Sequence, residues 1–195
     1  IVLVNKKSTI VKNSCVYIGS VFKGKGLETI IKVAEKLKDI NFHLYCNFNS
    51  IKKYHNFPKN IFFHSYKKYK FIPKILSKFD VALMPYSKKT HINAKKITNE
   101  KFISPLKLFD YLASKKIIIA SNLSAYSHIL IHKFNCLLVE PDNIREWETT
   151  IKKIFVDKKK YMYLKKNAHI TAKKYTWKLR IEKLDKFISI NKFYV

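Results

Sequence analysis

The sequence is poor in glycine, arginine and cysteine, and each shortage narrows what the chain can be. It has three glycines and three cysteines among 195 residues, and its arginines are Arg145 and Arg180. Arginine is the residue that proteins prefer for bidentate contacts with phosphates and bases, so no specific nucleic acid is expected as a partner. Cys15, Cys46 and Cys136 form an odd and scattered set. Such a set argues against a disulfide framework and for a reducing, cytoplasmic compartment.

Three further features are missing from the sequence. No apolar run reaches the length of a membrane span, and no signal peptide opens the chain. No cluster of cysteine and histidine has the spacing of metal ligands, so we expect no metal and no other cofactor. The chain starts at Ile1 rather than at a methionine, and a loop-like segment follows, which suggests a piece of a longer protein.

The formal net charge of +27 is compatible with an anionic partner such as nucleic acid or a membrane surface. The cations are nearly all lysine, however, and asparagine, isoleucine, phenylalanine and tyrosine are abundant while alanine is scarce. This combination is typical of drift in an AT-rich genome, which raises the lysine content without selecting for a partner. A basic module that binds nucleic acid or membranes therefore stays an alternative function. Peripheral association with the anionic inner face of the cell membrane is compatible with any of these functions and stays an open alternative for the location of the protein.

Apolar runs alternate with helical patterns along the whole chain. Strands are expected at 15–21, 42–46, 61–63, 81–84, 117–120 and 137–139. Helices are expected at 27–38, 71–78, 104–114, 124–131, from 143 onward, over 157–173 and over 176–188. Four residues suit the N-caps of these helices, namely Ser104, Ser124, Asn143 and Thr176. The alternation predicts an α/β fold, with a parallel sheet of about six strands flanked by helices.

All three glycines, Gly19, Gly24 and Gly26, fall within eight residues of one another, between an apolar strand and an amphipathic helix. Glycine lets the backbone approach a ligand closely, and a strand, a glycine-bearing loop and a helix start form the layout of a phosphate-binding turn. This loop places Lys23 and Lys25 beside free amides. A tight turn without a ligand is the alternative, because the spacing matches neither the dinucleotide fingerprint nor the Walker pattern.

A second candidate anion site is the helix start at Ser104. Serine at the N-cap and Pro105 at the first helical position leave amides and the helix dipole facing outward. Lys107 puts a cation in the first turn, where the dipole disfavours it, so we expect it to serve an anion. Asp110 is suited to accept hydrogen bonds from sugar hydroxyls. Solvated surface positions are the alternatives for both side chains. In open parallel sheets, ligands bind beyond the carboxyl ends of the strands, where both loops lie.

Five segments of the chain follow one another in a recognisable order. They are Tyr17-Ile18-Gly19 with Lys25-Gly26, FDVALMP at 79–85, SPLKLFDYLASKKIIIAS at 104–121, NCLLVEPD at 135–142, and Tyr175-Thr176-Trp177 with Arg180. In this order they resemble the motifs of the C-terminal, donor-binding domain of family 4 glycosyltransferases with the GT-B fold. The resemblance spans about residues 14 to 188.

This resemblance implies a Rossmann-like domain that binds a nucleotide-diphosphate sugar. It implies an interdomain linker at 1–13, the nucleotide-sugar-binding domain at 14–174, and a C-terminal helix at 175–195 that packs toward an N-terminal domain missing from this chain. Trp177 is expected to anchor the start of that helix. The implied reaction transfers the sugar to a saccharide or lipid-linked acceptor, with retention and without a metal, in the synthesis of cell-surface polysaccharide or glycolipid. The segment 86–103 is expected to be mobile and to lie over the donor sugar.

The resemblance also implies roles for individual residues. Lys25 and Asp110 are expected to be catalytic, and Asp110 takes the place of the family's second glutamate, which binds the ribose hydroxyls. The residues expected at the diphosphate are Gly19, Ser20, Lys25, Ser104, Pro105, Leu106 and Lys107. Phe102 and Ile103 are expected at the sugar. Ser20 stands where many members carry an arginine, and Phe102 stands where the family's first glutamate falls. A degenerate, non-catalytic domain is therefore a further alternative.

Overall fold

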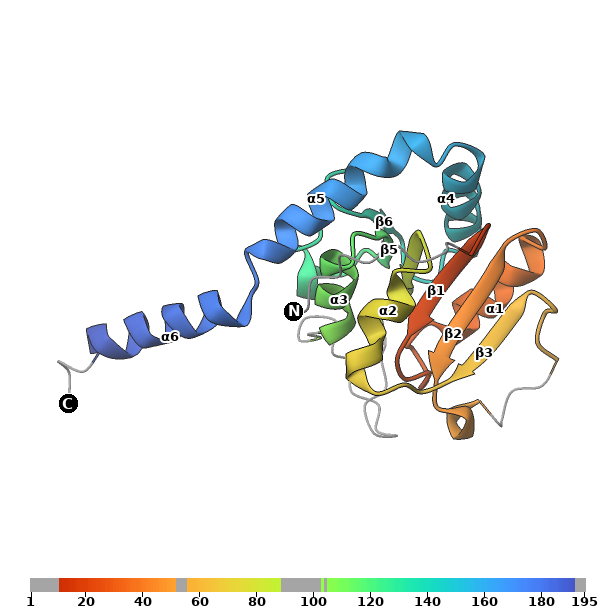
Figure 1. Cartoon of the computed structure of the whole chain (residues 1–195). Helices are drawn as coiled ribbons and strands as arrows, with labels where there is room; N and C mark the ends of the chain where they lie inside the picture. Colours follow the sequence, from red (N-terminus) through yellow and green to blue (C-terminus); the bar gives the residue numbers. More distant parts are fainter. Residues whose placement is uncertain (1–10, 52–55, 89–102, 104, 192–195) are drawn as a thin grey trace.

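The structure, a computed structural model, describes residues 11–51, 56–88, 103 and 105–191. Its centre is a sheet of six parallel strands in the order β3-β2-β1-β4-β5-β6 (Figure 1). The strands are β1 (Ser14–Ile18), β2 (Asn41–Cys46), β3 (Ile61–Ser65), β4 (Val81–Met84), β5 (Ile117–Ser121) and β6 (Leu137–Val139). The helices are α1 (Leu27–Lys36), α2 (Ile72–Leu76), α3 (Leu106–Ala113), α4 (Ile144–Val156), α5 (Met162–Lys173) and α6 (Trp177–Asn191). Short 3₁₀ turns are η1 (Phe48–Ser50), η2 (Tyr69–Phe71), η3 (Ser124–Tyr126) and η4 (Lys159–Tyr161). The predicted α/β fold with a parallel sheet is confirmed.

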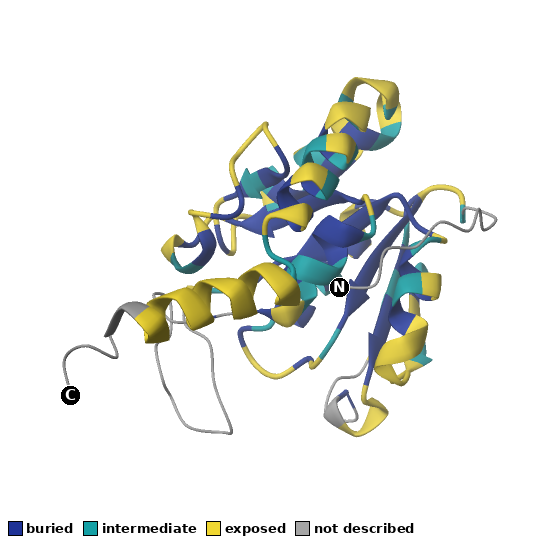
Figure 2. Cartoon of the chain, turned by 60° about the vertical axis from the view of Figure 1, so that its left-hand side comes forward, coloured by how far each residue is buried: buried dark blue, intermediate teal, exposed yellow. Residues whose placement is uncertain are grey.

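Strands β1, β4 and β5 are buried at every position because helices cover both sides of the sheet (Figure 2). In β1, Cys15 and Tyr17 point into one core, and Val16 and Ile18 point into the other. Helices α1 and α4 pack into the first core, while α2, α3 and most of α5 pack into the second. A strand buried on both faces needs apolar residues at every position, which is why the strands appear in the sequence as continuous apolar runs.

Some predicted boundaries are wrong. Strand β1 ends at Ile18 rather than at residue 21, since Gly19 has a φ of +134° that takes the chain out of strand geometry. Helix α3 begins at Leu106 with Pro105 as its cap residue, one residue later than predicted. The helix predicted over 124–131 is only the turn η3, because the Asn135 side chain bonds the backbone that follows it, at Ile129 and Ile131.

Two predicted helix caps are confirmed. The Asn143 side chain accepts a hydrogen bond from the Glu146 amide at 3.2 Å and opens α4. The Thr176 hydroxyl accepts a hydrogen bond from the Leu179 amide at 3.3 Å and opens α6. In each case a side-chain oxygen satisfies an amide that the first turn of a helix leaves without a backbone partner.

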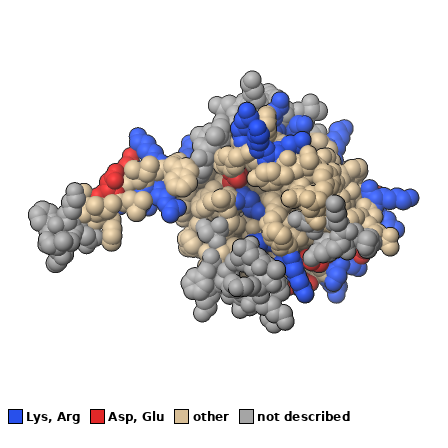
Figure 3. All heavy atoms as spheres, turned by 90° about the horizontal axis from the view of Figure 1, so that it is seen from below, with Lys and Arg blue, Asp and Glu red and all other residues tan. Residues whose placement is uncertain are grey.

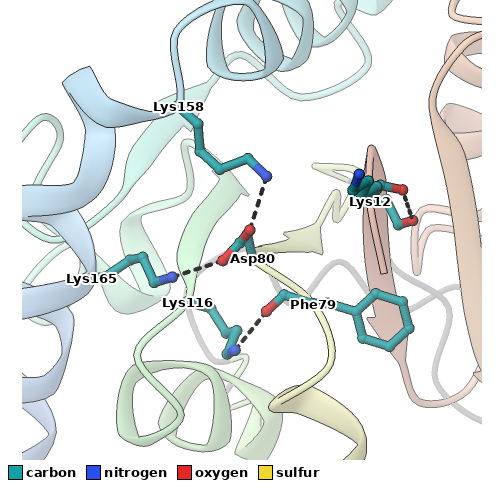
Figure 4. Close-up of polar contacts among 7 residues, drawn as sticks. Lys12, Phe79, Asp80, Lys116, Lys158 and Lys165 are labelled. Atoms are coloured by element: carbon teal, nitrogen blue, oxygen red, sulfur yellow. Dashed lines mark hydrogen bonds and ion pairs between the residues drawn. The ribbon is translucent and has the colours of Figure 1, made fainter. Parts of the chain in front are cut away.

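A buried carboxylate ties α5 to the sheet at the end of β4 that lies away from the glycine loop (Figure 4). Asp80, just before β4, accepts hydrogen bonds from Lys165 at 2.7 Å and from Lys158 at 2.9 Å. Nearby, the Lys116 amine donates to the Phe79 carbonyl at 2.6 Å. Burial alone would raise the pKa of the Asp80 carboxyl, but the hydrogen bonds and charges of Lys165 and Lys158 lower it below its usual range. Lys116, Lys158 and Lys165 therefore have a structural role.

Helix α6 projects from the body of the molecule, and its side chains at 177–189 are exposed (Figures 1 and 2). Trp177 at its start is 63% exposed and Ile181 is 54% exposed. The prediction that Trp177 anchors this helix is wrong for this chain, because the indole is not packed into either core.

Candidate functional site

The strand order places a crevice at the carboxyl ends of β1 and β4. From β1 the chain moves outward through β2 and β3, and it then returns to β4 on the other side of β1. The loops after β1 and β4 therefore leave in opposite directions. In open α/β sheets, ligands bind at this switch point. The glycine loop, residues 19–26, follows β1, and Pro85 to Ser87 follow β4.

The glycine loop is held against the segment that follows β4. Gly26 has a φ of +99°, and a Cβ there would lie 2.3 Å from the Pro85 carbonyl oxygen. No other residue fits at this position, because both the conformation and the contact exclude a side chain. The Ser87 amide also donates to the Gly24 carbonyl at 3.1 Å. The two loops thus form one wall of the crevice.

Two tyrosine hydroxyls set the shape of this wall. The Tyr17 hydroxyl lies 2.5 Å from the Ser20 carbonyl oxygen and 3.1 Å from the Lys25 carbonyl oxygen, so it bridges the two ends of the glycine loop. The Tyr111 hydroxyl of α3 accepts a hydrogen bond from the Ile18 amide at 3.0 Å. Through this bond the helix is attached to the end of β1, where the glycine loop begins.

Lys107 of α3 presents a buried amine to the crevice. Its stem is partly exposed, but its Nζ atom is buried and has no hydrogen-bond partner among the described residues. The amine lies 3.7 Å from the Tyr17 ring centroid and 5.2 Å from that of Tyr86, and a Cβ on Gly19 would lie 2.9 Å from it. Burial lowers the pKa of Lys107 well below its usual value, and the charge of Lys25 lowers it further. An anion in the crevice would supply the partner that this amine lacks.

Lys25 approaches the same place from the glycine loop. Its amine lies 4.9 Å from the Tyr86 ring centroid, and partial burial lowers its pKa. Lys23, two residues earlier in the loop, is exposed. On the face shown in Figure 3, lysine and arginine side chains are scattered and acidic ones are few. The crevice is therefore distinguished by two half-buried or buried amines beside aromatic rings, and not by the number of charges around it.

Asp110, one turn after Lys107 on α3, is engaged by a tyrosine from the turn η2. The Tyr69 hydroxyl donates to Asp110 Oδ1 at 2.7 Å. Burial raises the pKa of the Asp110 carboxyl, and the bond from Tyr69 acts in the opposite direction. Burial and the bond to Asp110 raise the pKa of Tyr69 to about 12. The pair is therefore a phenol that donates to a carboxylate, on the side of α3 that faces η2.

The remaining predicted site residues are Ser20, Ile103, Pro105 and Leu106, which the structure describes, and Phe102 and Ser104. Ser20 is exposed, with its carbonyl held by Tyr17. Pro105 and Ile103 are buried, and the side chain of Leu106 is 74% exposed. Phe102 and Ser104 lie outside the described residues, and so do residues 89–101 of the segment predicted to cover the sugar.

The start of that segment is attached to the turn between β6 and α4. The Ser87 hydroxyl donates to Asp142 at 2.8 Å, and Lys88 pairs with Glu140 at 2.5 Å. Both acidic residues follow β6, two strands away from β4 in the sheet. The segment therefore leaves β4 across the carboxyl ends of the neighbouring strands.

Sequence reasoning gave no role to the tyrosines that build the crevice, Tyr17, Tyr69, Tyr86 and Tyr111. One signal was available for Tyr17 and Tyr111, which lie within apolar patterns where phenylalanine would fill the same space. A buried tyrosine needs a hydrogen-bond partner, so a tyrosine at such a position indicates a polar contact. No pattern in the sequence pairs Tyr69 with Asp110, which lies 41 residues away.

An apolar groove of about 550 Å³ lies between α3 and α6. Tyr69, Phe109, Asp110, Tyr175 and Trp177 are among its lining residues.

Among the described residues, no group of three or more histidine, cysteine, aspartate or glutamate side chains could hold a metal ion. Within the same ranges, no helix is both long and apolar enough to cross a membrane.

Comparisons with known proteins agree with this arrangement. The family described as "Glycosyl transferases group 1" matches residues 5–171. Anabaena HepE, solved in complex with UDP, superimposes with a TM-score of 0.76 at 14% identity, over 91% of this chain and 48% of that one. TarM superimposes with a TM-score of 0.68 at 18% identity, over 93% of this chain and 37% of that one. The C-terminal domain of LpcC from Francisella tularensis has a TM-score of 0.62 at 18% identity, over 85% and 86% of the two chains.

The chain thus spans less than half the length of HepE and TarM, and most of the length of the isolated LpcC domain. At these identities the likeness to solved structures establishes the fold. No curated protein matches the chain.

Proposed function

Since the chain belongs to the family of group 1 glycosyl transferases, as its C-terminal, Rossmann-like domain of GT-B type, we propose that it binds the donor of a glycosyl transfer, a nucleotide-diphosphate sugar. The observation that carries this proposal is the amine of Lys107, which is buried at the switch point of the sheet and has no hydrogen-bond partner in the part of the chain that the structure describes. HepE and S. aureus TarM were solved with UDP, which makes UDP the first nucleotide to test here.

In the proposed complex, the diphosphate lies between the glycine loop and the start of α3. Lys107 and Lys25 contact its oxygens, and the first amides of α3, at Leu106 and Lys107, point toward it together with the positive end of the helix dipole. Asp110 accepts hydrogen bonds from the ribose. Transfer leaves negative charge on the departing nucleotide diphosphate, and fixed cations and amides stabilise that charge. Lys25 acts in catalysis in this way, without a metal.

The acceptor and the rest of the catalytic machinery belong to the part of the enzyme that this chain does not contain. This chain covers 48% of HepE and 37% of TarM, so an N-terminal domain of the complete enzyme is the proposed partner of α6. The complete enzyme is proposed to transfer the sugar with retention to a saccharide or lipid-linked acceptor, at the cytoplasmic side of the membrane, in the synthesis of cell-surface polysaccharide or glycolipid.

The test is calorimetric titration of this chain with UDP, GDP and ADP, in the wild type and in Lys25→Ala. A charge-assisted contact contributes about 1.5–3 kcal/mol, so the variant should bind the preferred diphosphate at least about tenfold more weakly. Lys23→Ala is the matched control, because it removes an exposed lysine from the same loop. If both variants lose the same affinity, diffuse charge attracts the nucleotide and the proposal fails. It also fails if the wild type binds none of the three.

A further inference from the structure

We propose that Tyr69 positions Asp110 to recognise the ribose of the donor, and that the hydrogen bond between them makes this site selective for ribonucleotides. The inference rests on the proposed donor site and adds a residue from outside the glycine loop and α3. Tyr69 belongs to η2, the turn that follows the edge strand β3. It is therefore the contribution of a third loop at the carboxyl edge of the sheet.

The geometry favours orientation of the carboxylate. The Tyr69 hydroxyl donates to Oδ1 of Asp110 at 2.7 Å, a short bond typical of a charged acceptor. One oxygen of the carboxylate is thereby fixed, and the direction of the other is set with it. Asp110 is also partly buried, which disfavours its charged form. A donor at Oδ1 offsets part of that penalty and so favours the charged form, which accepts hydrogen bonds from hydroxyls.

The bond contributes little to the fold itself. Tyr69 is 55% exposed, Phe71 in the same turn is 45% exposed, and Tyr66 just before the turn is 66% exposed. The core of this part of the molecule is made by other side chains, such as Ile72 and Leu76 of α2. A hydrogen bond between partly exposed groups adds little free energy of unfolding, because water competes for both partners. A role in the site accounts for the bond better than a role in stability.

The placement also explains why an aspartate can serve here. An aspartate has one side-chain torsion fewer than the glutamate that the resemblance expects, and its carboxylate lies closer to the helix backbone. The hydroxyl of Tyr69 reaches this shorter side chain from across the space between η2 and α3. Both residues line the groove beside α3, so an incoming ligand could reach them there.

The test compares UDP with 2′-deoxy-UDP by calorimetric titration, or the guanosine pair if GDP binds more tightly. In Tyr69→Phe, the affinity for the ribonucleotide should fall about three- to tenfold, while that for the deoxynucleotide falls less. Tyr66→Phe is the control, because it removes a hydroxyl from an exposed ring in the same connection between β3 and η2. Its two affinities should be unchanged. The double variant Tyr69→Phe, Asp110→Asn should bind no more weakly than Asp110→Asn alone, since both act through one contact.

Each other outcome overturns the inference. An equal loss for the two nucleotides would show that Tyr69 only supports the shape of the site. A gain in ribonucleotide affinity would show that Tyr69 competes with the ribose for Asp110. An unchanged ratio in Asp110→Asn would show that this carboxylate does not contact the 2′-hydroxyl, while the effect of Lys25→Ala would still support the donor site. If the wild type binds no nucleotide, the proposed function fails and the inference fails with it.

Discussion

Replacement of Lys107 by methionine should raise the stability of the protein and weaken nucleotide binding at the same time. The amine of Lys107 is buried without a partner among the described residues. A buried group left without a hydrogen bond costs about 1–3 kcal/mol, and the contact with the Tyr17 ring returns part of that, up to about 2 kcal/mol. Lys107→Met keeps an apolar stem and removes the amine. We therefore expect the free energy of unfolding to rise by up to about 1 kcal/mol.

For a chain of this size, a change of 1 kcal/mol moves the melting temperature by about 2–4 °C, which differential scanning calorimetry resolves. The same variant loses a charge-assisted contact with the diphosphate, so its affinity for UDP should fall at least about tenfold. If Lys107 had a purely structural role, Lys107→Met would be less stable than the wild type and would bind UDP with unchanged affinity. That result would refute the assignment of Lys107 to the anion site.

The pH dependence of binding follows from the same amine. Burial, and then the charge of Lys25, hold the pKa of Lys107 well below its usual value in the free protein, and a bound diphosphate raises it. Above the pKa that Lys107 has in the free protein, binding of UDP is accompanied by uptake of a proton. The affinity for UDP should therefore fall as the pH rises. Titrations in pairs of buffers with different ionisation enthalpies, repeated over a series of pH values at which the diphosphate is fully ionised, count that proton. Lys107→Met should abolish the uptake.

Three further predictions concern the fold. Burial and the charge of His64 lower the pKa of His43 to about 4 from the usual 6.5. The contribution of His43 to stability is therefore complete above pH 6.5 and is lost as the pH falls toward 4. In urea unfolding, the free energy of unfolding should fall less between pH 7 and pH 5 in His43→Phe than in the wild type. Lys165→Met leaves Asp80 with one of its two lysine partners and should lower the free energy of unfolding by about 1–3 kcal/mol, measured by urea unfolding. An unchanged free energy of unfolding would contradict a structural role of the contact between Lys165 and Asp80. Deletion of residues 186–195 removes the exposed positions 186–189 of α6 and should leave the melting temperature nearly unchanged. A loss of several degrees would mean that the deleted segment packs on the domain.

The sequence identified the class of fold because each level of local pattern agreed with the next. Continuous apolar runs, helical spacing and two side-chain caps, Asn143 and Thr176, all predicted the elements that the structure contains. The errors occurred where a tertiary contact replaces a local one. The expected helix over 124–131 is absent because Asn135, which comes later in the chain, supplies the backbone there with other partners. The resemblance led us to expect that Trp177 anchors the start of α6, but the exposure of this side chain depends on what lies beside the helix.

The candidate site divides in the same way. The glycine loop and the lysines Lys25 and Lys107 were predicted as site residues from local chemistry, since a glycine-rich turn and a helix start bind anions in many folds. Local sequence does not state that Gly26 packs on Pro85, that the Lys107 amine is buried against Tyr17, or that Tyr69 meets Asp110. These contacts join segments far apart in the chain, and they exist because the order of the strands brings the ends of β1, β3 and β4 to one edge of the sheet. Residue type decides which groups are able to hold an anion, whereas their burial and partners, which set charge and orientation, depend on that topology.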